Sequence, residues 1–493
     1  MKLDKIFQDP EIVEVRNNDP DIDIQHIVYN SQKVVPGSAF VAIKGFKTDG
    51  HRYVQDAINR GAVAIVYEYD LDDYVDGVMY IKVRNARHML GTMASRFYGH
   101  PSEKLSVTGV TGTNGKTTIT YMLKKIFTLA GRKCGLFGTI NNQIGDEILD
   151  NAGRTTPDSL EVQEMMAAMV EKKCDNVVME VSSHALDLDR VNGVAFDYAI
   201  FTNLTEDHMD YHKTFENYFE AKAKLFTYSS KANIINCDDE WGKKLYDRCS
   251  GYKGVAVYSY GMNEACDFYA KDLEYSTKGT RYTLVTKDGE TEIFVGIPGE
   301  VMVYNSMPAI INALLEGIPL EIIKEGLATM ETAEGRMEIL NLDTDFDVII
   351  DYAHTPDALE RLLKSVRKMY DGKIILVFGC NGDRDRQKRP MMGHIAGELA
   401  DYVVVTSDNP ASEDPQSIID VVAEAVAEKT DCYTTKLCRT DAVDYAVTLP
   451  GPGDVLVLAG KGHEKQEIMK DEVLYYNEWD AVKEAIARMK SAE

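Results

Sequence analysis

Short apolar runs along the chain alternate with stretches in which apolar residues recur every three or four positions. Two of these runs, "GSAFVAIKG" (37–45) and "GAVAIVYE" (61–68), lie near the N-terminus, and "LSVTGV" (105–110) starts a further series. Runs of this kind form buried strands, and the intervening periodicity is that of amphipathic helices. The pattern predicts an α/β fold in which helices cover mainly parallel sheets.

Length and turn signals divide the chain into three predicted domains. At roughly 100–200 residues per domain, a chain of 493 residues favours three. The first series of strands ends at a turn in "YGHPSEKL" (98–105), and four strand-to-loop passages follow Gly335. Ligands of open parallel sheets bind beyond the carboxyl ends of the strands, so the polar tails of these four strands are the expected place for chemistry. We predict an N-terminal α/β domain over 1–101, a central domain with a mainly parallel sheet over 102–334, and a Rossmann-like domain over 335–493.

Charge and composition exclude several classes of partner. Lys and Arg number 54 against 79 Asp and Glu, which gives a net charge of −25 and argues against nucleic acid and anionic membrane surfaces. No run approaches the roughly 18 apolar residues of a membrane span, and acids stand where a signal peptide would be apolar. The eight cysteines include no C-x-x-C pair and are interpreted as reduced thiols. We expect a cytoplasmic monomer that binds neither nucleic acid nor membranes.

The segment "GVTGTNGKTT" (109–118) has the character of a phosphate-binding loop, with its glycines displaced. The usual pattern G-x-x-x-x-G-K-[ST] needs glycine at 110, where this chain has Val110. A strand, the loop and an amphipathic helix nevertheless follow in order, so backbone N–H groups and a helix N-terminus face one anion. Lys116 can reach the terminal phosphates, and Thr117 or Thr118 can offer a hydroxyl group to magnesium. The alternative is a tight turn rich in glycine and threonine.

Lys222 occupies an apolar position of a predicted helix, whereas Lys224 points elsewhere. Desolvation lowers the pKa of such an amine, and a neutral amine can react with carbon dioxide to give an anionic carbamate. The alternative is a lysine whose ammonium group reaches solvent at the edge of the stripe. The stripe is made of Phe215, Phe219, Lys222 and Phe226.

Glu180 ends the apolar run of "VMEVSSHAL", where a buried carboxylate needs a cation or a hydrogen-bond donor. Magnesium is one such partner, and a strand-end acid exposed to water is the alternative. His184 and His212 are weaker candidates, because either can be a packed histidine with its hydrogen bonds satisfied.

The loop "TGTNGKTT" resembles that of the Mur ligases and folylpolyglutamate synthetases, which are ATP-dependent amide ligases. Further motifs across nearly the whole chain are similar to Mur ligases of the MurE type, which add the third amino acid to UDP-N-acetylmuramoyl-L-alanyl-D-glutamate in peptidoglycan precursor synthesis. The resemblance implies a UDP-muramoyl-binding first domain, an ATP-binding P-loop domain and an amino-acid-binding third domain. The motifs are "TTPDSLEV", "VMEVSSHALDLDRV", "FTNLTEDHMDYHKTFENYFEAKAKLF", "DYAHTPDAL", "GCNGDRDRQKRPMM" and "AGKGHE".

The same resemblance implies a role for each matching residue, with ATP and Mg²⁺ as cofactors and a reaction through an acyl phosphate. The implied catalytic residues are Lys116, Glu180, His208, carbamylated Lys222 and His354, and the implied magnesium ligands are Thr117, Glu180, His208 and the Lys222 carbamate. The implied ATP-binding residues are Gly112, Thr113, Asn114, Gly115, Lys116, Thr117, Thr118, Asn305, Arg336 and Asp351. The UDP-muramoyl-dipeptide is assigned to Ser31, Thr155, Thr156, Ser183 and Arg190, and the incoming amino acid to Arg384, Asp408, Asn409, Pro410, Ala411, Gly460 and Glu464.

Two segments depart from the family pattern. Where the family usually has Asp-Ser-Arg for the uridine diphosphate, this chain has Asn30 and Gln32 around Ser31, so the diphosphate contact is weaker or differently made. Val301 and Met302 replace the phenylalanine and the first asparagine of the segment that seats the adenine. These changes leave open a divergent Mur-like or folate-type ligase with another acceptor, or a nucleotide-binding switch without turnover. The motifs "EVSSHAL", "TTPD" and "SDNPASEDP" argue against another ligase type.

The acceptor amino acid is predicted from "DNPASEDP". Enzymes of this type that use meso-diaminopimelate usually read Asp-Asn-Pro-Arg, and here Ala411 stands in place of the arginine that pairs with the distal carboxylate. We therefore expect L-lysine to be preferred, with its ammonium group favoured by nearby acids. The alternative is that Arg386 or Lys388 contacts the distal carboxylate. The acids are Asp408, Glu413 and Asp414.

Overall fold

The computed structural model describes residues 9–19, 21–45, 48–151, 154–276, 278–330, 334–340 and 342–492. The chain forms two compact units. Their described residues fall in Met1–Gly109, Arg132–Ala199 and Lys224–Lys231 for the first unit, and in Val110–Gly131, Ile200–Ala223 and Ala232–Glu493 for the second. The domain boundaries expected after residues 101 and 334 stay predictions, because this division follows the packing of segments rather than their order in the chain.

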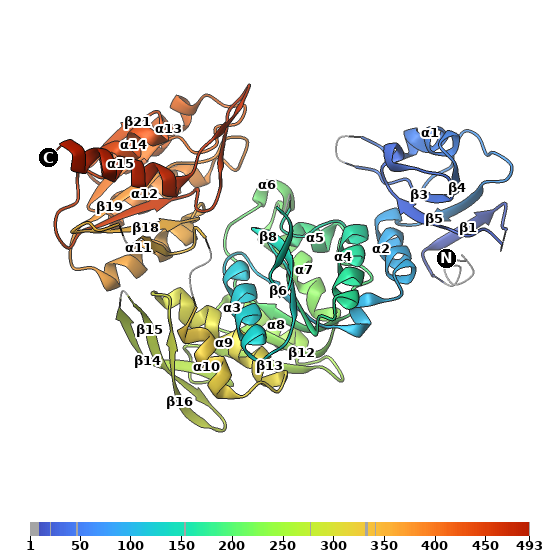
Figure 1. Ribbon diagram of the computed structural model, residues 1–493, viewed down its shortest axis with the longest axis horizontal. Helices are drawn as coiled ribbons and strands as arrows, with labels where there is room; N and C mark the ends of the chain where they lie inside the picture. The colour runs from blue at the N-terminus through green and yellow to red at the C-terminus, as the bar shows by residue number, and fades with distance from the viewer. Residues whose placement is uncertain are drawn as a thin grey trace. The chain divides into compact units, whose positions relative to one another are not determined.

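The N-terminal part of the first unit is a sheet that, within the described ranges, has five strands in the order β1-β5-β4-β3-β2 (Figure 1). All neighbouring strands are parallel except β1 and β5. The apolar runs expected near residues 37–45 and 61–68 are strands β3 and β4, and their side chains are almost all buried. The elements are β1 (Ile12–Arg16), β2 (His26–Val28), β3 (Ser38–Val41), β4 (Ala62–Tyr67), β5 (Met79–Val83), α1 (Val54–Asn59) and α2 (Ala86–Phe97), with short 3₁₀ turns at η2 (Ser31–Lys33), η3 (Gly50–Tyr53) and η4 (Pro101–Lys104).

The rest of the first unit contains a second group of strands in the order β10-β7-β8-β9. β10 and β7 are parallel, and β8 and β9 continue the group as an antiparallel meander. Helix α4 begins after the "TTPD" segment, and the short helix α5 follows β10. The bounds are β7 (Cys134–Phe137), β8 (Asn141–Ile144), β9 (Glu147–Asn151), β10 (Asn176–Glu180), α4 (Ser159–Glu171) and α5 (Ser183–Asp187).

In the second unit, the helix expected after the glycine-rich loop is α3 (Lys116–Leu129). Its apolar stripe packs on α9 and α10, where Gly326 lies against Ile126. Strands β12 to β14 are parallel, and β15 and β16 add an antiparallel edge. Strands β6 (Ser106–Thr111), β11 (Phe196–Phe201) and β12 (Ser229–Asn236) have residues in both units, and η5 (Lys224–Thr227) belongs to the first. The other bounds are β13 (Ala256–Gly261), β14 (Phe268–Ser276), β15 (Gly279–Thr286), β16 (Gly289–Val295), α6 (Met209–His212), α7 (Phe215–Ala223), α8 (Glu240–Cys249), α9 (Glu300–Leu315) and α10 (Leu320–Ala328).

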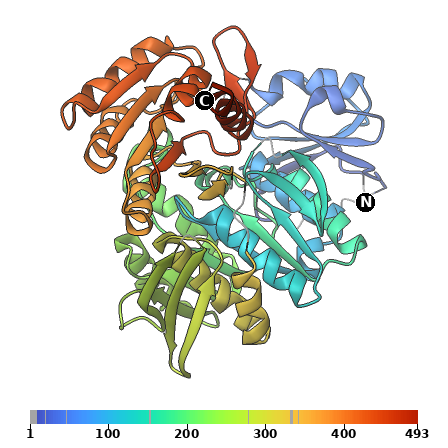
Figure 2. The same ribbon diagram turned by 60° about the vertical axis from the view of Figure 1, so that its left-hand side comes forward.

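The C-terminal part of the second unit is a sheet in which the described strands run β17-β18-β22-β19-β20-β21, parallel apart from β17. Apolar residues of α14 and α15 pack on alternate residues of β18, β19 and β22 to form its core. A hairpin of β23 and β24 is drawn in red in Figure 2. The bounds are β17 (Glu338–Leu340), β18 (Asp347–Asp351), β19 (Ile374–Phe378), β20 (Tyr402–Thr406), β21 (Tyr433–Lys436), β22 (Val455–Ala459), β23 (Gln466–Ile468), β24 (Val473–Tyr475), α11 (Pro356–Met369), α12 (Lys388–Leu399), α13 (Pro415–Ala427), α14 (Arg439–Ala446) and α15 (Glu478–Ala492).

The predicted α/β class with mainly parallel sheets is confirmed. Polar residues follow the carboxyl ends of the C-terminal strands, as Asp351 does in β18, Asp408 after β20 and Gly460 after β22. Parallel strands bring these ends to one edge of the sheet, which is where ligands of such sheets bind. Within the described ranges, no helix is long and apolar enough to cross a membrane.

A buried ion pair ties this edge to the last helix. Arg439 at the start of α14 and Glu478 at the start of α15 are 0% and 1% exposed, and their closest N···O distance is 2.5 Å. The same guanidinium group donates to the carbonyl oxygen of Ala459, which ends β22. One arginine therefore joins a strand end to two helices.

We predict that Arg439→Met destabilises the C-terminal domain by about 3 kcal/mol or more, because it leaves the Glu478 carboxylate buried without its cation. The exposed pair of Arg488 and Asp444 joins the same two helices, so Arg488→Met is the matched control and should cost less than about 1 kcal/mol. Urea unfolding followed by the fluorescence of Trp479 on α15 measures both. Equal losses for the two variants would contradict the prediction.

Candidate functional site

The displaced glycines of the loop are explained by what packs against them. Gly112 has φ of 147° and Gly115 has φ of 91°, values that favour glycine. A Cβ atom added to Gly112 would lie 1.7 Å from Oγ1 of Thr202, and one added to Gly115 would lie 2.5 Å from Oδ1 of Asn305. The amide N–H of Asn114 donates to the Asn203 side chain at 3.0 Å. The loop is thus held by residues that follow β11 and by α9, and both glycines are needed for that contact.

Lys116 begins α3 and folds back over the loop. Its ammonium group donates to the carbonyl oxygens of Gly112 at 2.9 Å and Thr113 at 2.8 Å. Thr117, the next residue on the helix, is buried. Thr118 faces a cavity at the loop. The loop therefore presents a cation and helix N–H groups to the same space.

That cavity brings together six of the ten residues expected to bind ATP. Two of them carry a buried nitrogen with no hydrogen-bond partner within the described part of the chain, namely Nδ2 of Asn305 and Nε of Arg336. Such donors are costly to bury unless a ligand accepts their hydrogen bonds. Met302 lines the same cavity beside Val301, so the replaced asparagine leaves an apolar wall. The six residues are Asn114, Gly115, Thr118, Asn305, Arg336 and Asp351.

Lys222 lies on α7 with only 1% of its surface exposed, so the alternative in which its ammonium group reaches solvent is wrong. Its Nζ atom donates to the carbonyl oxygen of Gly112 at 2.8 Å and lies 4.5 Å from the centre of the Tyr218 ring. Burial, and then the positive charge of Lys116, holds the pKa of Lys222 well below its ordinary value, while Asp207 opposes the shift. A neutral amine at this position is the chemistry that carbamate formation needs.

Asp207 is a charged neighbour that the sequence analysis missed, although it stands in the quoted "TEDHMD" motif. Burial raises the pKa of this carboxyl group, but the cations around it, His208 first, bring the pKa below its ordinary value. His354 is partly buried, and desolvation together with the charge of Lys388 lowers its pKa to about 4. Its Nδ1 atom lies 2.9 Å from the carbonyl oxygen of Tyr352, so a neutral ring donates there. His354 and Asp207 therefore lie in one charged cluster.

Glu180 ends β10 and is fully buried, so the solvent-exposed alternative is wrong. Its two carboxylate oxygens accept hydrogen bonds from the backbone N–H and the hydroxyl group of Thr139, at 2.8 and 2.9 Å. The Thr139 hydroxyl is also 3.2 Å from that of Thr155, and the Thr156 hydroxyl donates to the Glu180 carbonyl at 2.9 Å. Thr139 was missed because no motif marks it.

The expected magnesium ligands stay a prediction. Glu180 belongs to the first unit, and His208 and Lys222 belong to the second. Over the residues that the structure describes, no three His, Cys, Asp or Glu side chains form a cluster suited to a metal ion. The predicted set differs from such a cluster, since one of its ligands is the Lys222 carbamate.

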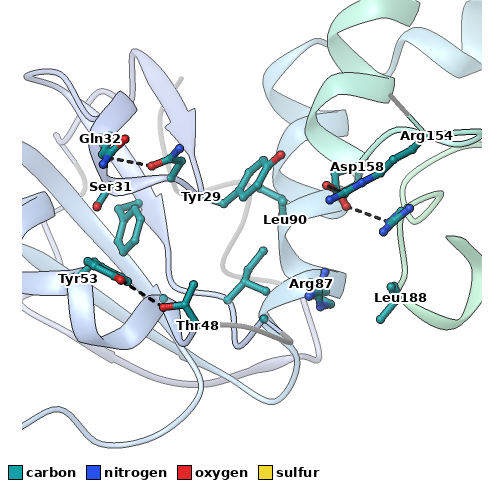
Figure 3. Close-up of a pocket in the computed structure, with 17 residues that line it drawn as sticks. Tyr29, Ser31, Gln32, Thr48, Tyr53, Arg87, Leu90, Arg154, Asp158 and Leu188 are labelled. Atoms are coloured by element: carbon teal, nitrogen blue, oxygen red, sulfur yellow. Dashed lines mark hydrogen bonds and ion pairs between the residues drawn. The ribbon is translucent and has the colours of Figure 1, made fainter. Parts of the chain in front are cut away.

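A pocket of about 630 Å³ lies in the first unit (Figure 3). Of the residues expected to bind the UDP-muramoyl-dipeptide, Ser31 and Arg190 line it. Arg190 forms an ion pair with the Asp158 carboxylate at 3.0 Å, and its Nη1 donates a hydrogen bond to the Thr156 carbonyl oxygen at 3.3 Å. Ser183 is buried at the start of α5. Ser31 and Arg190, which are far apart in the sequence, therefore line the same pocket.

The residues expected to bind the amino acid lie at the edge of the C-terminal sheet. The Asn409 amide donates to Glu464 at 2.7 Å and accepts from Lys461 at 2.9 Å. Lys461, which the sequence analysis missed, is fully buried and lies 3.3 Å from Asp408. Arg384 is exposed, and Pro410 precedes Ala411, whose φ is 51°. One buried ammonium group therefore contacts Asp408, Asn409 and Glu464.

The acidic surroundings expected for a lysine acceptor are already neutralised. Glu413 accepts hydrogen bonds from Arg389 and is paired with Arg386 at 3.1 Å. The hydrogen bond from Arg389 lowers the pKa of Glu413 to about 2. Asp408 is paired with Lys461, and the Asp414 side chain caps α13. Glu413 and Asp414 are engaged within the domain, so they do not argue for an ammonium group on the acceptor, whereas both buried oxygens of Asp408 lack a hydrogen-bond partner among the described residues.

Comparisons with known proteins agree with this architecture. Three family models match the chain: the Mur ligase family catalytic domain at 23–98, the Mur ligase middle domain at 110–313, and the Mur ligase glutamate ligase domain at 335–462. A solved structure described as UDP-N-acetylmuramoyl-L-alanyl-D-glutamate–2,6-diaminopimelate ligase is 29% identical and covers 99% of both chains with a TM-score of 0.73. MurF from Acinetobacter baumannii, at 20% identity and a TM-score of 0.63, shares the fold.

Relatives by sequence match the chain from end to end. Proteins of Clostridium botulinum and Clostridioides difficile are 44% and 43% identical over 490 residues, which is 99% of this chain and 99% and 100% of theirs. Both are named UDP-N-acetylmuramoyl-L-alanyl-D-glutamate–2,6-diaminopimelate ligase, so the predicted preference for lysine has no support in these relatives. The chain belongs to the Mur ligase family of ATP-dependent ligases, which form amide bonds, and has its three domains.

Proposed function

We propose that this protein joins 2,6-diaminopimelate to UDP-N-acetylmuramoyl-L-alanyl-D-glutamate, coupled to the conversion of ATP to ADP and phosphate. The observation that carries the proposal is the name shared by relatives that match almost the whole chain at 43–44% identity. The product is a precursor of peptidoglycan. The protein acts in the cytoplasm, where ATP and nucleotide-linked precursors are available.

The reaction proceeds in two steps. The side-chain carboxylate of the D-glutamyl residue attacks the γ-phosphorus of ATP, ADP leaves, and an acyl phosphate forms. The amine of the acceptor then attacks the acyl carbon, phosphate leaves, and the amide nitrogen loses a proton. Neither step needs a covalent enzyme intermediate, so the protein contributes positioning and electrostatic stabilisation.

ATP occupies the cavity at the glycine-rich loop. Asn305 and Arg336 have the unpaired nitrogens that a nucleotide can satisfy, and Met302 offers an apolar surface to the base. Lys116 exchanges its two loop carbonyl oxygens for phosphate oxygens and stabilises the charge on the migrating phosphoryl group. The remaining loop residues, Gly112, Thr113, Asn114 and Gly115, contribute backbone N–H groups.

The chemistry of Lys222 fits a magnesium site. Its amine is buried and has a low pKa, and as a carbamate it becomes an anion beside Lys116. We propose that this carbamate holds Mg²⁺ together with Glu180, His208 and Thr117. When bound, Mg²⁺ offsets negative charge on the phosphoryl oxygens. His354 stays neutral near pH 7 because its pKa is about 4, so it contributes a hydrogen bond rather than a charge.

The acceptor is held at the edge of the C-terminal sheet. Arg384 binds the α-carboxylate common to all acceptors, and Glu464, Asn409 and Gly460 surround the rest of the molecule. Ala411 cannot pair with the distal carboxylate, so another cation must do so. Arg386 is suited to this role because its side chain is 74% exposed and Arg389 keeps Glu413 paired when Arg386 turns away.

We predict that 2,6-diaminopimelate is used at least about a hundredfold better than L-lysine, since a charged pairing is worth a few kcal/mol. The measurement is the ratio of kcat/KM for the two acceptors, from phosphate release that requires UDP-muramoyl-dipeptide. Arg386→Ala should lower diaminopimelate use about tenfold and leave lysine use unchanged. Arg488→Ala, an exposed arginine of the same domain, is the control. A ratio in favour of lysine would contradict diaminopimelate as the acceptor. Phosphate release in the absence of UDP-muramoyl-dipeptide and amino acid would contradict the proposed ligase activity.

We predict that Lys222→Ala lowers kcat by at least about a hundredfold, because it removes the anion proposed to hold magnesium. A short carboxylic acid such as acetate should restore part of the activity. In ¹³C-bicarbonate, the wild-type protein should show a carbamate carbon signal that is lost in Lys222→Ala and kept in Lys224→Ala, whose lysine is partly exposed. An active Lys222→Ala variant, or a wild-type protein without the carbamate signal, would contradict the assignment.

A further inference from the structure

The pocket of the first unit is lined by three arginines and one aspartate, and two of the arginines are already paired (Figure 3). Asp158, just before α4, accepts a hydrogen bond from Arg154 at 2.6 Å, and its other oxygen forms an ion pair with Arg190 at 3.0 Å. One carboxylate therefore joins both guanidinium groups. The four side chains together carry a net charge of +2, although the whole chain carries −25.

Arg87 is the third arginine, and within the described residues it has no acidic partner. The only hydrogen bond of its side chain among these residues is a long one, 3.5 Å from Nη2 to the carbonyl oxygen of Lys44. Arg87 stands in the first turn of α2, where Asn85 caps the backbone N–H groups. A cation in the first turn is unfavourable because of the helix dipole. An arginine that lacks an anion at such a position is available for an anionic ligand.

The segment at residues 30–32 lacks the arginine that the family usually has at position 32. The Asn30 side chain accepts from the backbone N–H of Gln32 at 3.0 Å, so it performs the turn-forming role that an aspartate would have there. Gln32 is exposed and neutral, and it lines the pocket together with Ser31. The replacement of the arginine that the family usually has at this position therefore removes a guanidinium group from the pocket.

We propose that Arg87 binds the diphosphate of the UDP moiety and replaces the guanidinium group that Gln32 lacks. The inference rests on the proposed function, because it takes a UDP-linked substrate as the occupant of this pocket. A diphosphate ester carries about two negative charges, which matches the net charge of the lining residues. The planar guanidinium group can bind two phosphate oxygens at once. Arg154 and Arg190 stay with Asp158, and Arg87 makes the direct contact.

The test compares UDP, UMP and uridine by calorimetry on the full-length protein without turnover. In the wild-type protein, affinity should rise strongly from uridine to UDP. Arg87→Gln should lower the affinity for UDP about tenfold or more and leave the affinity for uridine unchanged. Adding Gln32→Arg to Arg87→Gln should restore much of the lost UDP affinity. The control is Arg60→Gln, which changes an arginine that is paired with Asp56 outside the pocket. It should alter the affinity for neither UDP nor uridine.

The outcomes separate this inference from the function on which it rests. If the wild-type protein binds UDP and Arg87→Gln keeps the same ratio of UDP to uridine affinity, the role of Arg87 is wrong and the ligase proposal is unaffected. If the wild-type protein binds neither UDP nor UDP-muramoyl-dipeptide, both the role of Arg87 and the proposed ligase function are wrong. An equal loss of UDP and uridine affinity would mean that Arg87 shapes the pocket without binding phosphate, which also overturns the inference. A thermal midpoint at or above that of the wild type shows that Arg87→Gln is folded.

Discussion

The carbonyl oxygen of Gly112 accepts hydrogen bonds from two lysines, Lys116 at 2.9 Å and Lys222 at 2.8 Å. This shared acceptor places two amines side by side in a buried space, where each disfavours the charge of the other. Burial first, and then the charge of Lys116, lowers the pKa of Lys222, which is the more deeply buried amine. The arrangement depends on the backbone of Gly112, which has room only because Thr202 meets a glycine there. The position of the glycine in the loop thus brings the ammonium groups of Lys116 and Lys222 to one acceptor.

The proposed ligand sites carry positively charged side chains, although the net charge of the whole chain is −25. The glycine-rich loop contains Lys116 and the pocket of the first unit contains Arg87, while the other arginines of that pocket are paired with Asp158. At the C-terminal sheet edge, by contrast, carboxylates and cations are matched one to another, as with Asp408 and Lys461. Anionic ligands are therefore attracted by a few specific side chains, since the overall field of the protein repels them.

The departures from the family pattern have different consequences at different places. Asn30 keeps the turn-forming hydrogen bond of the residue that it replaces, so only its charge is lost. Met302 forms a wall of the nucleotide cavity, where an apolar side chain can pack on a base. Ala411 adopts a left-handed backbone conformation and removes a cation. The first two changes are compatible with the proposed ligands, and the third is the reason that we propose another arginine as the partner of the acceptor's distal carboxylate.

Sequence by itself determined the features that local patterns encode. Apolar runs and helical periodicity predicted the α/β class, and the position of Lys222 on an apolar stripe indicated its burial, because the period of a helix fixes which residues share a face. Arg87, Thr139, Asp207 and Lys461 had no such pattern. Arg87 lies 55 positions beyond Gln32, and Thr139 is 41 positions before the Glu180 carboxylate that it binds. Only the tertiary structure decided which of these groups lie close together, because a charge or a hydrogen bond acquires its partner when distant segments pack together, and spacing along the chain does not report that distance.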